Sequence, residues 1–534
     1  MNATTLLHQL VTESALRAPD AGALRDGAAE LSYEALAGQI GAFASGMMAL
    51  GLDRTERVGV YLDKRFETVI ASFGAAAAGG VFVPVNPILK PQQVGYILQD
   101  CNVRVLVTSV ERFKPLADTL SDCHDLRHVI LTGKVDTLPE LPGMSIHRWA
   151  DVMAAPARAG HRVIDNDMLA ILYTSGSTGR PKGVVLSHRN MVAGAKSVAT
   201  YLENRADDTL LAALPLSFDA GFSQLTTAFH AGARVVLLNY LMPRDVLNAL
   251  VKHKVTGLTA VPPLWIQLSQ LEWPETVTDH LRYIANTGGR MPLETLTALR
   301  ARLPRTKPYL MYGLTEAFRA TYLPPDQVDV RPDSIGKAIP NSDVFVLRED
   351  GSPCEPGEPG ELVQRGALVA MGYWNDPEKT AERFKPLPVT APGRQAGLVL
   401  PEIAVFSGDN VRRDEEGYLY FIGRRDEMMK TSGYRVSPTE VEEILYGTHL
   451  VGECVAFGVP HPSLGQAICV IATPRAGSAL DSAALLAECK QRMPAYMVPS
   501  VIEVRDGPLP RNPNGKIDRK TLSTEFENAR KVQS

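Results

Sequence analysis

Apolar residues along this chain gather in short runs, and helical patterns separate one run from the next. Residues 58–61 predict a buried strand, and the small residues at 67–80, "ETVIASFGAAAAGG", predict a helix that ends at two glycines. Further short strands are expected at 81–87, 103–108 and 128–131. Because strands and helices alternate in this way, the pattern predicts a parallel sheet covered by helices.

The same alternation returns in the middle of the chain and then stops. Strands are expected at 233–239, 255–262 and 281–289, which indicates a second parallel α/β sheet. Residues 334–420 instead contain short runs joined by turn residues such as "GSPCEPGEPGE". That texture predicts a small antiparallel, barrel-like segment.

The chain after "GRRDE" predicts a compact α/β tail of roughly a hundred residues, an ordinary size for a domain. Its expected elements are helices at 437–447 and 482–492 and strands at 452–460, 467–474 and 500–506. The final residues, "STEFENARKVQS", are polar and are expected to fray. We therefore predict an N-terminal domain, residues 1–424, and a C-terminal domain, residues 425–534.

Length, composition and charge narrow the class of protein. The 534 residues exceed one compact core, so two or more domains are expected. With 45% hydrophobic and 21% charged residues, the composition is that of an ordinary soluble globular protein. The formal net charge of −4 gives no electrostatic footprint for nucleic acid or anionic lipid, although it leaves a local basic patch open. We expect no nucleic-acid partner.

Cysteines and apolar stretches bear on the compartment. The six cysteines form no C-x-x-C pair, and their scatter predicts reduced thiols in a cytoplasmic enzyme rather than disulfides or a zinc site. The N-terminus has no basic region and only a short apolar run, so we do not expect a secretory signal. Residues 69–85 are dominated by alanine and glycine, which favours a buried helix and strand over a membrane span.

The stretch "YTSGSTGRPKGVVLSH", residues 173–188, is the first candidate for chemistry. A flexible linker, a Walker-type P-loop and a different phosphate-binding loop each fit part of it. The P-loop fits poorly because Pro181 stands where the second glycine belongs, and Gly183 where the magnesium-binding hydroxyl belongs. A linker seldom places cations between two apolar runs. We therefore favour a phosphate loop in which glycines admit the anion and Lys182 adds charge.

The stretch "MYGLTEAF", residues 311–318, carries groups that suit a nucleotide. Tyr312 offers a stacking face for a base, Thr315 a donor to phosphate, and Glu316 a carboxylate for Mg²⁺. The alternative interpretation is a turn followed by a helix cap.

Two later motifs add an acid and a cation. In "FSGDN", Asp409 suits the two hydroxyls of a ribose, although Asp after Gly is most often turn chemistry. In "PRNPNGKIDRK", Lys516 follows the hairpin-turn signal Asn514-Gly515. Its alternative is a solvated surface lysine, the commonest fate of lysine.

Taken in order, these stretches resemble the motifs of the adenylate-forming superfamily, which includes acyl-CoA synthetases, adenylation domains of peptide synthetases and luciferases. The matching stretches are "YTSGSTGRPKGVVLSH", "YGLTE", "GELVQRGALVAMGYW", "FSGDN", "GRRDEMMKTSGYRVSPTEVE" and "PNGKIDRK". The resemblance covers residues 31–520, and six motifs in one order are far more specific than any one of them. It implies that the fold is α/β, with two parallel α/β sheet subdomains and a small antiparallel barrel-like subdomain in the N-terminal domain, followed by a small mobile α/β C-terminal domain.

The resemblance also implies a role for each matching residue. The β,γ-phosphates would be held by Thr174, Ser175, Gly176, Ser177, Thr178, Gly179 and Lys182. Adenine and the acyl group would meet Gly288, Gly289, Tyr312 and Gly313; the α-phosphate would meet Thr315; and Mg²⁺ would meet Glu316. Ribose would be held by Asp409, with Arg424 helping at ribose or phosphate. Lys516 would bridge the substrate carboxylate and the α-phosphate, and the loop near Gly433 would admit the pantetheine arm. Asp426 matches the hinge between the domains.

The function that the resemblance implies is an AMP-forming acid–thiol ligase. Such an enzyme uses ATP and Mg²⁺ to convert a carboxylic acid to an acyl-adenylate, and then transfers the acyl group to coenzyme A or to the phosphopantetheine of an acyl carrier protein. A stand-alone amino-acid adenylation enzyme is the first alternative. A luciferase-like oxygenase and a non-enzymatic relative are disfavoured, the latter because the chain keeps Lys516, Glu316 and the loop.

The acyl pocket is the least determined part of the prediction. Phe218 and Asp219 stand where relatives that activate amino acids have Phe-Asp, so Asp219 is hypothesised to pair with a substrate amino group. The alternative is that Asp219 caps a helix beginning near Gly221. Arg319 either neutralises Asp219 or holds a second substrate carboxylate.

Overall fold

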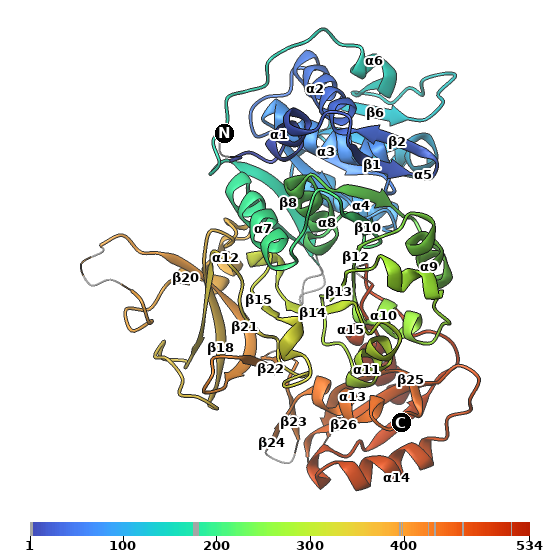
Figure 1. Cartoon of the computed structure of the whole chain (residues 1–534), viewed down its shortest axis with the longest axis vertical. Coiled ribbons are helices and arrows are strands. Elements are labelled where there is room, and N and C mark those ends of the chain that lie inside the picture. The colour runs from blue at the N-terminus through green and yellow to red at the C-terminus, as the bar shows by residue number, and fades with distance from the viewer. Residues whose placement is uncertain are drawn as a thin grey trace.

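The computed structural model describes residues 4–174, 181–394, 397, 399–425, 427–431, 434–461, 464–513 and 515–533. Two large α/β layers are stacked, an antiparallel sheet projects to one side of them, and the C-terminal segment lies at the opposite end from α2 and α6 (Figure 1). The predicted α/β fold class is confirmed.

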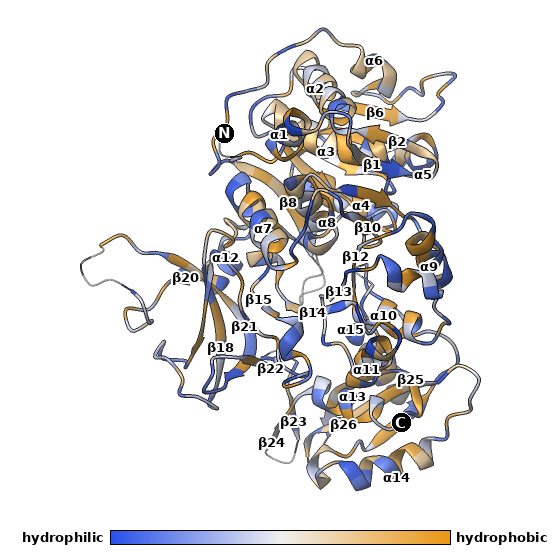
Figure 2. Ribbon diagram, viewed as in Figure 1, coloured by the Kyte–Doolittle hydropathy of each residue, from blue (hydrophilic) through white to orange (hydrophobic). Residues whose placement is uncertain are grey.

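The first layer is built on an eight-stranded sheet. Its order is β19 (Gly372–Tyr373), β9 (Lys182–Ser187), β8 (Met168–Thr174), β4 (Val81–Pro84), β3 (Arg57–Tyr61), β5 (Val103–Ser109), β6 (His128–Thr132) and β7 (Ser145–Arg148). The run from β8 to β7 is parallel, as its strand–helix alternation predicts. Figure 2 shows β6 and β8 in orange, as expected for strands buried on both faces.

The second layer is a nine-stranded sheet that contributes most of the side chains described below. Its order is β16 (Lys337–Ala338), β15 (Thr321–Leu323), β14 (Lys307–Tyr312), β13 (Tyr283–Asn286), β12 (Gly257–Ala260), β10 (Thr209–Ala212), β11 (Arg234–Leu237), β1 (Gly22–Asp26) and β2 (Ala29–Ser32). The six strands from β14 to β1 are parallel, so their carboxyl ends share one edge of the sheet.

Helices cover both sheets and fill the space between them. They are α1 (Gln9–Arg17), α2 (Tyr33–Ala49), α3 (Phe66–Ala78), α4 (Pro91–Asp100), α5 (Val110–Leu120), α6 (Trp149–Met153), α7 (His188–Tyr201), α8 (Asp219–Ala231), α9 (Pro243–Lys252), α10 (Pro262–Ser269) and α11 (Leu293–Arg302). Helix α8 is buried over almost its whole length, and Phe222 stacks on Phe82 of β4 with ring centroids 4.8 Å apart. The core of the two layers is therefore continuous through α8.

The antiparallel segment and the C-terminal domain each have a sheet of their own. The first contains β17 (Ser342–Leu347), β18 (Pro359–Gly366), β20 (Phe384–Pro386), β21 (Ile403–Arg413) and β22 (Leu419–Arg424), beside α12 (Pro377–Arg383). The second contains β23 (Met429–Thr431), β24 (Tyr434–Val436), β25 (Val451–His461), β26 (Gly465–Pro474) and β27 (Val501–Val504), with α13 (Pro438–Tyr446) and α14 (Ser482–Arg492).

The C-terminus corrects one prediction. Residues 519–533 form α15 (Arg519–Gln533), whereas the polar composition predicted frayed chain. The reason is that Leu522 and Phe526, four positions apart, share one face of the helix and are buried against the sheet of β25 and β26. The ring of Phe526 meets Phe457 of β25 edge-on at 5.5 Å. Two well-placed apolar side chains thus dock an otherwise polar helix.

Two further sequence predictions bear on cysteine and on membranes. All six cysteines are buried thiols, and none of them is in a disulfide bond. In the part of the chain that the structure describes, we find no helix with the length and apolar character needed to cross a bilayer.

The buried His188 makes stability depend on pH. Burial lowers the pKa of His188 to about 4, and its Nδ1 accepts a hydrogen bond from the Leu7 N–H at 3.1 Å. An unfolded histidine titrates near 6.5, so protons favour the unfolded chain as the pH falls from about 6.5 toward 4. His188→Asn retains an acceptor but does not titrate. On acidification, we expect the free energy of unfolding of the variant to fall by about 3 kcal/mol less than that of the wild-type protein. Urea unfolding at pH 7.5 and pH 4.5 measures it, and equal losses in both proteins would contradict the assignment.

Candidate active site

The predicted phosphate loop connects two antiparallel strands. It follows β8 and leads into β9, and Thr174 at the end of β8 pairs with Lys182 at the start of β9. A Walker-type P-loop leads from a strand into a helix, so this connection excludes that alternative. Residues 175–180 lie outside the described residues, and with them the predicted phosphate contacts of Ser175, Gly176, Ser177, Thr178 and Gly179.

Lys516 reaches from the C-terminal domain to the carboxyl edge of the nine-stranded sheet. There β13 ends in a turn at Gly288, whose φ of +75° favours glycine. A Cβ on Gly288 would lie 3.3 Å from Lys516 Cε and 3.2 Å from Val261 Cγ1, so the missing side chain leaves room for the lysine. A hydrogen bond from Asn86 Nδ2 to the Pro513 carbonyl, at 2.7 Å, ties the lysine loop to the N-terminal domain.

The charges around Lys516 have opposing effects. Surrounding protein lowers the pKa of Lys516 by removing water from the ammonium, while the negative charge of Asp219 raises it. Arg424 lowers the pKa and Asp409 raises it. The residue as a whole remains exposed to solvent. Lys516 therefore presents an accessible cation at a point where several site residues converge.

Tyr312 and Asp409 meet from different sheets. Tyr312 ends β14, Asp409 lies on β21, and the Tyr312 hydroxyl donates a hydrogen bond to Asp409 Oδ2. Arg424 faces Asp409 across the β21–β22 pair, with Nε 3.8 Å from Oδ1. Burial raises the pKa of Asp409, and Tyr312 and Arg424 counter that rise. The sequence motifs that predicted an adenine and a ribose contact are thus brought together.

Glu316 and Lys182 both lie close to one tyrosine, Tyr373. The Tyr373 hydroxyl donates to Glu316 Oε1 at 2.6 Å, and Lys182 Nζ lies 5.7 Å from the centre of the Tyr373 ring. Among the described residues, no three His, Cys, Asp or Glu side chains gather to form a metal cage. A single oriented carboxylate beside a cation suits Mg²⁺, which keeps several waters and takes its other ligands from substrate phosphates.

Asp219 and Arg319 form a buried ion pair. Arg319 Nη1 donates to Asp219 Oδ2 at 2.8 Å, and Thr315 Oγ1 donates to Asp219 Oδ1 at 3.4 Å. The two residues are 7% and 2% exposed. Asp219 is the first residue of α8, and the N-cap, Phe218, makes no side-chain cap. The helix-cap interpretation of Asp219 is therefore wrong, and the option that Arg319 neutralises Asp219 is confirmed.

A backbone turn directs Arg319 toward that partner. Phe318, immediately before it, has a φ of +59° and a ψ of −62°, a conformation that is rare for a bulky residue. The Phe318 ring is fully buried against Gly194 of α7, where a Cβ would lie 2.4 Å from the ring. Packing of this ring against the glycine holds the strained turn that sends Arg319 inward.

Two contributors to the site carried no signal in the sequence. Tyr373 orients Glu316, yet "GYW" gave no reason to pair it with a residue 57 positions away. Lys64 Nζ donates to the Ala213 carbonyl at 2.8 Å, just before the segment that leads to Asp219. Burial lowers the pKa of Lys64 to about 8. Asp426 and Gly433, predicted for the hinge and the pantetheine arm, lie outside the described residues.

Comparison with known proteins identifies the family. The profile of the AMP-binding enzyme family matches residues 11–374, and that of the AMP-binding enzyme C-terminal domain matches residues 440–516. This chain belongs to the AMP-binding enzymes. The predicted resemblance to adenylate-forming proteins is thereby confirmed.

Curated relatives of this AMP-binding enzyme include acid–CoA ligases. A long-chain-fatty-acid–CoA ligase of Escherichia coli O157:H7 is 30% identical over 509 residues, which cover 89% of this chain and 86% of that protein. A feruloyl-CoA synthase of Amycolatopsis sp is 31% identical over 511 residues, 93% of this chain and 94% of that one. Bacitracin synthase 3 of Bacillus licheniformis is 30% identical over 521 residues, which are 97% of this chain but 8% of that protein.

Solved structures share the fold over nearly the whole chain. ATP-bound MatB from Rhodopseudomonas palustris has a TM-score of 0.85 at 24% identity and covers 99% of this chain and 100% of its own. The anthranilate CoA ligase AuaEII in complex with anthranoyl-AMP has a TM-score of 0.86 at 24% identity, covering 99% of each chain.

Proposed function

We propose that this AMP-binding enzyme is an AMP-forming acyl-CoA ligase. It activates a carboxylic acid with ATP to an acyl-adenylate and pyrophosphate, and transfers the acyl group to the thiol of coenzyme A. The observation that carries the proposal is the position of Lys516 at Gly288, within electrostatic reach of both Asp219 and Asp409. The names of curated relatives, a long-chain-fatty-acid–CoA ligase and a feruloyl-CoA synthase, support the same chemistry.

The first half-reaction brings two anions together. The substrate carboxylate attacks the α-phosphate of ATP, a new C–O–P linkage forms, and the bond to pyrophosphate breaks. Lys516 would contact the carboxylate and the α-phosphate at once and lower their mutual repulsion, which a compact ammonium does well. Thr315 would donate its hydroxyl to the same phosphate, since that hydroxyl already points into the site toward Asp219.

The nucleotide and its counter-ion would be held by the residues already described. Asp409 and Arg424 would take the ribose, and Tyr312 would release Asp409 and lie against the base. Glu316, oriented by Tyr373, would hold Mg²⁺, which supplies positive charge to the phosphate oxygens. Lys182 would add a second cation on the same side.

In the second half-reaction the thiol attacks the acyl carbonyl and AMP leaves. Coenzyme A is the acceptor that we propose, because it is named in the relatives that match over most of their own length. A carrier protein presents the same pantetheine arm, and the match to a segment of bacitracin synthase 3 keeps it as a second acceptor to test. Gly433 would allow the arm to approach.

Amino-acid activation is less well supported than activation of a plain acid. Its argument is that Phe218-Asp219 stands where amino-acid-activating relatives have Phe-Asp, and the Asp219 carboxylate is paired with Arg319 rather than left for a substrate amino group. An oxygenase or a non-enzymatic role gains no support from the relatives described above.

The experiment that tests the function has two arms. ATP–pyrophosphate exchange is measured with fatty, aryl, hydroxy and amino acids, and the product is then challenged with coenzyme A or with a phosphopantetheinylated carrier protein. We expect exchange with at least one acid and a thioester with coenzyme A. Exchange that leads to no thioester with either thiol would overturn the ligase assignment.

The hinge assignment makes a prediction of its own. If the C-terminal domain rotates about Asp426 between half-reactions, Asp426→Pro should keep adenylation near the wild-type rate and reduce thioester formation about tenfold or more, since proline fixes φ. Exchange and single-turnover thioester formation measure the two steps separately. Unchanged thioester formation would reject Asp426 as the hinge.

A further inference from the structure

A small cavity adjoins the Asp219–Arg319 pair. It has a volume of about 20 Å³, room for one or two water-sized groups. It lies between helices α7 and α8 and the strands β10, β12, β13 and β14. Arg319 lines it and also bonds Asp219, which in turn contacts Thr315. The cavity therefore adjoins the proposed reaction centre through the ion pair.

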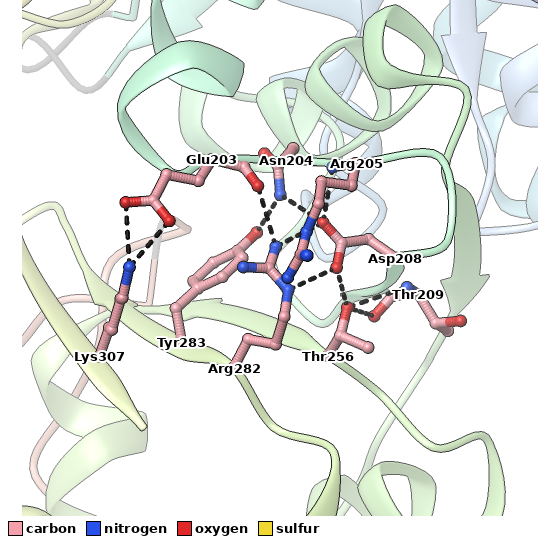
Figure 3. A network of polar contacts seen from close by, with 9 residues as sticks. All are labelled: Glu203, Asn204, Arg205, Asp208, Thr209, Thr256, Arg282, Tyr283 and Lys307. Atoms are coloured by element: carbon pink, nitrogen blue, oxygen red, sulfur yellow. Dashed lines mark hydrogen bonds and ion pairs between the residues drawn. The ribbon is translucent and has the colours of Figure 1, made fainter. Parts of the chain in front are cut away.

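The amino ends of the strands close this cavity. Tyr283 begins β13 and lines the cavity, and its hydroxyl accepts a hydrogen bond from Asn204 Nδ2 at 3.1 Å. Gly257 lies against it, and a Cβ there would stand 2.3 Å from the tyrosine ring. Figure 3 shows Tyr283 beside Arg282 and its partner Asp208, with Asn204 at the tyrosine hydroxyl.

That support makes the closed end rigid. Arg282 donates to both carboxylate oxygens of Asp208, at 2.8 and 2.5 Å, and its guanidinium carbon lies 5.6 Å from the Tyr283 ring centre. Asp208 also accepts from Thr256 at 2.7 Å. Tyr283 is thus held by Asn204 and by the Arg282–Asp208 pair beside it, and its ring blocks the way for a long acyl chain.

The lining is polar on the side of α8. Ser223 and Thr227 face each other with their hydroxyl oxygens 3.3 Å apart, and both are buried. Gln224 also lines the cavity, but its amide already donates to the Gly221 carbonyl at 2.9 Å. A purely hydrocarbon acyl group would therefore meet hydroxyls on one wall of the cavity.

One donor at this cavity has no acceptor. Arg319 is 2% exposed, its Nη1 is used by Asp219 and the Phe318 carbonyl, and the Tyr201 hydroxyl lies close to the guanidinium. No acceptor meets hydrogen-bond geometry at the buried Nε–H. A buried N–H without an acceptor is destabilising, and an acceptor in the cavity would recover that loss. The Arg319 Nε–H therefore favours a ligand whose oxygen can accept a hydrogen bond.

The charge of that oxygen follows from the ion pair. The Asp219–Arg319 pair is electrically balanced as it stands, so a substrate ammonium or a second carboxylate beside it would bury a charge that has no counter-ion of its own. A buried charge without a partner is strongly destabilising. An uncharged hydroxyl or carbonyl oxygen accepts from Nε and leaves the pair intact.

We propose that the acid is short and carries an uncharged oxygen, a hydroxyl or carbonyl, that accepts the Arg319 Nε–H. The inference rests on the proposed ligase function and makes Arg319 and Tyr283 its specificity determinants. It separates this enzyme from the long-chain acids named in its relatives and from amino acids.

The test is ATP–pyrophosphate exchange with acids matched in length. Butanoate, 4-hydroxybutanoate, 4-oxopentanoate, 4-aminobutanoate, succinate and dodecanoate are compared by kcat/KM. We expect the hydroxy or the oxo acid to exceed butanoate by about tenfold or more, because a site built to donate to oxygen discriminates against an analogue that lacks it. The charged acids and dodecanoate should fall below butanoate.

Two variants identify the residues responsible. Arg319→Lys keeps the charge opposite Asp219 but removes the Nε–H. In this variant the kcat/KM for the hydroxy or oxo acid should lie within about threefold of the kcat/KM for butanoate. Tyr283→Leu should move the preferred chain length upward. If either variant fails to fold, the kcat/KM values of the wild-type enzyme for the six acids are sufficient to support or reject the proposal.

The outcomes separate this inference from the proposed function. A wild-type preference for butanoate, for a charged acid or for dodecanoate would overturn the inference and leave the ligase intact. Absence of exchange with every acid, here and in the wider panel, would overturn both.

Discussion

Lys516→Ala is expected to lower the rate of adenylate formation about 10²- to 10³-fold, the usual loss when one group that stabilises developing charge is removed. The reason is geometric. Lys516 Cε lies 3.3 Å from the position of a Cβ on Gly288, at the edge where two substrate anions must meet. Without the ammonium, the carboxylate and the α-phosphate repel each other at close range, and water screens them poorly in a surrounded site.

The same variant should form thioester from a preformed acyl-adenylate at close to the wild-type rate, since no second anion has to approach in that step. Pyrophosphate exchange measures the first step and single-turnover thioester formation the second. Lys520→Ala, four residues along the same segment, is the matched control for loss of a lysine charge. Equal losses in both half-reactions, with an unchanged unfolding midpoint, would contradict the separate role of Lys516.

Local hydrophobic patterns in the sequence predicted most of the fold because its strands are short, buried and bounded by turn residues. The strand predicted at 58–61 is β3, and the helix predicted at 482–492 is α14. Helix α15 was missed because its docking depends on Leu522 and Phe526 meeting strand β25, which begins some seventy residues earlier. Periodicity of two apolar residues in a polar segment is too weak to predict such a contact.

The functional-site residues show the same difference between what a local motif predicts and what only the folded structure determines. Tyr312, Glu316, Asp409 and Lys516 were predicted because each lies in a motif whose order along the chain is specific. Contacts between residues of different motifs could be predicted only in part. Asp219 and Arg319 carry opposite charges and lie 100 positions apart in the chain, but whether they neutralise each other depends on the strained turn at Phe318.

This pairing bears on how relatives are used to infer a substrate. Two curated relatives with nearly the same identity to this chain, 30% and 31%, are named for a long-chain fatty acid and for ferulate. Identity at that level therefore leaves the acid open. The residues that limit it here are Tyr283, held by Asn204, and Arg319, held by Asp219. Specificity thus depends on a few buried contacts rather than on the motifs that define the family.

Glu316→Gln is expected to lower exchange about 10²-fold or more and to raise the Mg²⁺ concentration needed for half-maximal rate. The glutamine keeps the size of the side chain and its hydrogen bond with Tyr373, but lacks the negative charge that a hard divalent cation requires. A Mg²⁺ titration of exchange at saturating ATP measures the shift.

Tyr373→Phe is the control that separates charge from orientation. It leaves the carboxylate of Glu316 in place and removes the hydroxyl that donates to Oε1 at 2.6 Å. Loss of an orienting partner of a metal ligand typically costs 10- to 100-fold, so we expect a decrease of about tenfold, smaller than that of Glu316→Gln. Lys182 lies against the same ring, and the phenylalanine preserves that contact. If Glu316→Gln left the Mg²⁺ dependence unchanged while Tyr373→Phe reduced exchange, Glu316 would be a packing partner of Tyr373 and the metal would be held elsewhere.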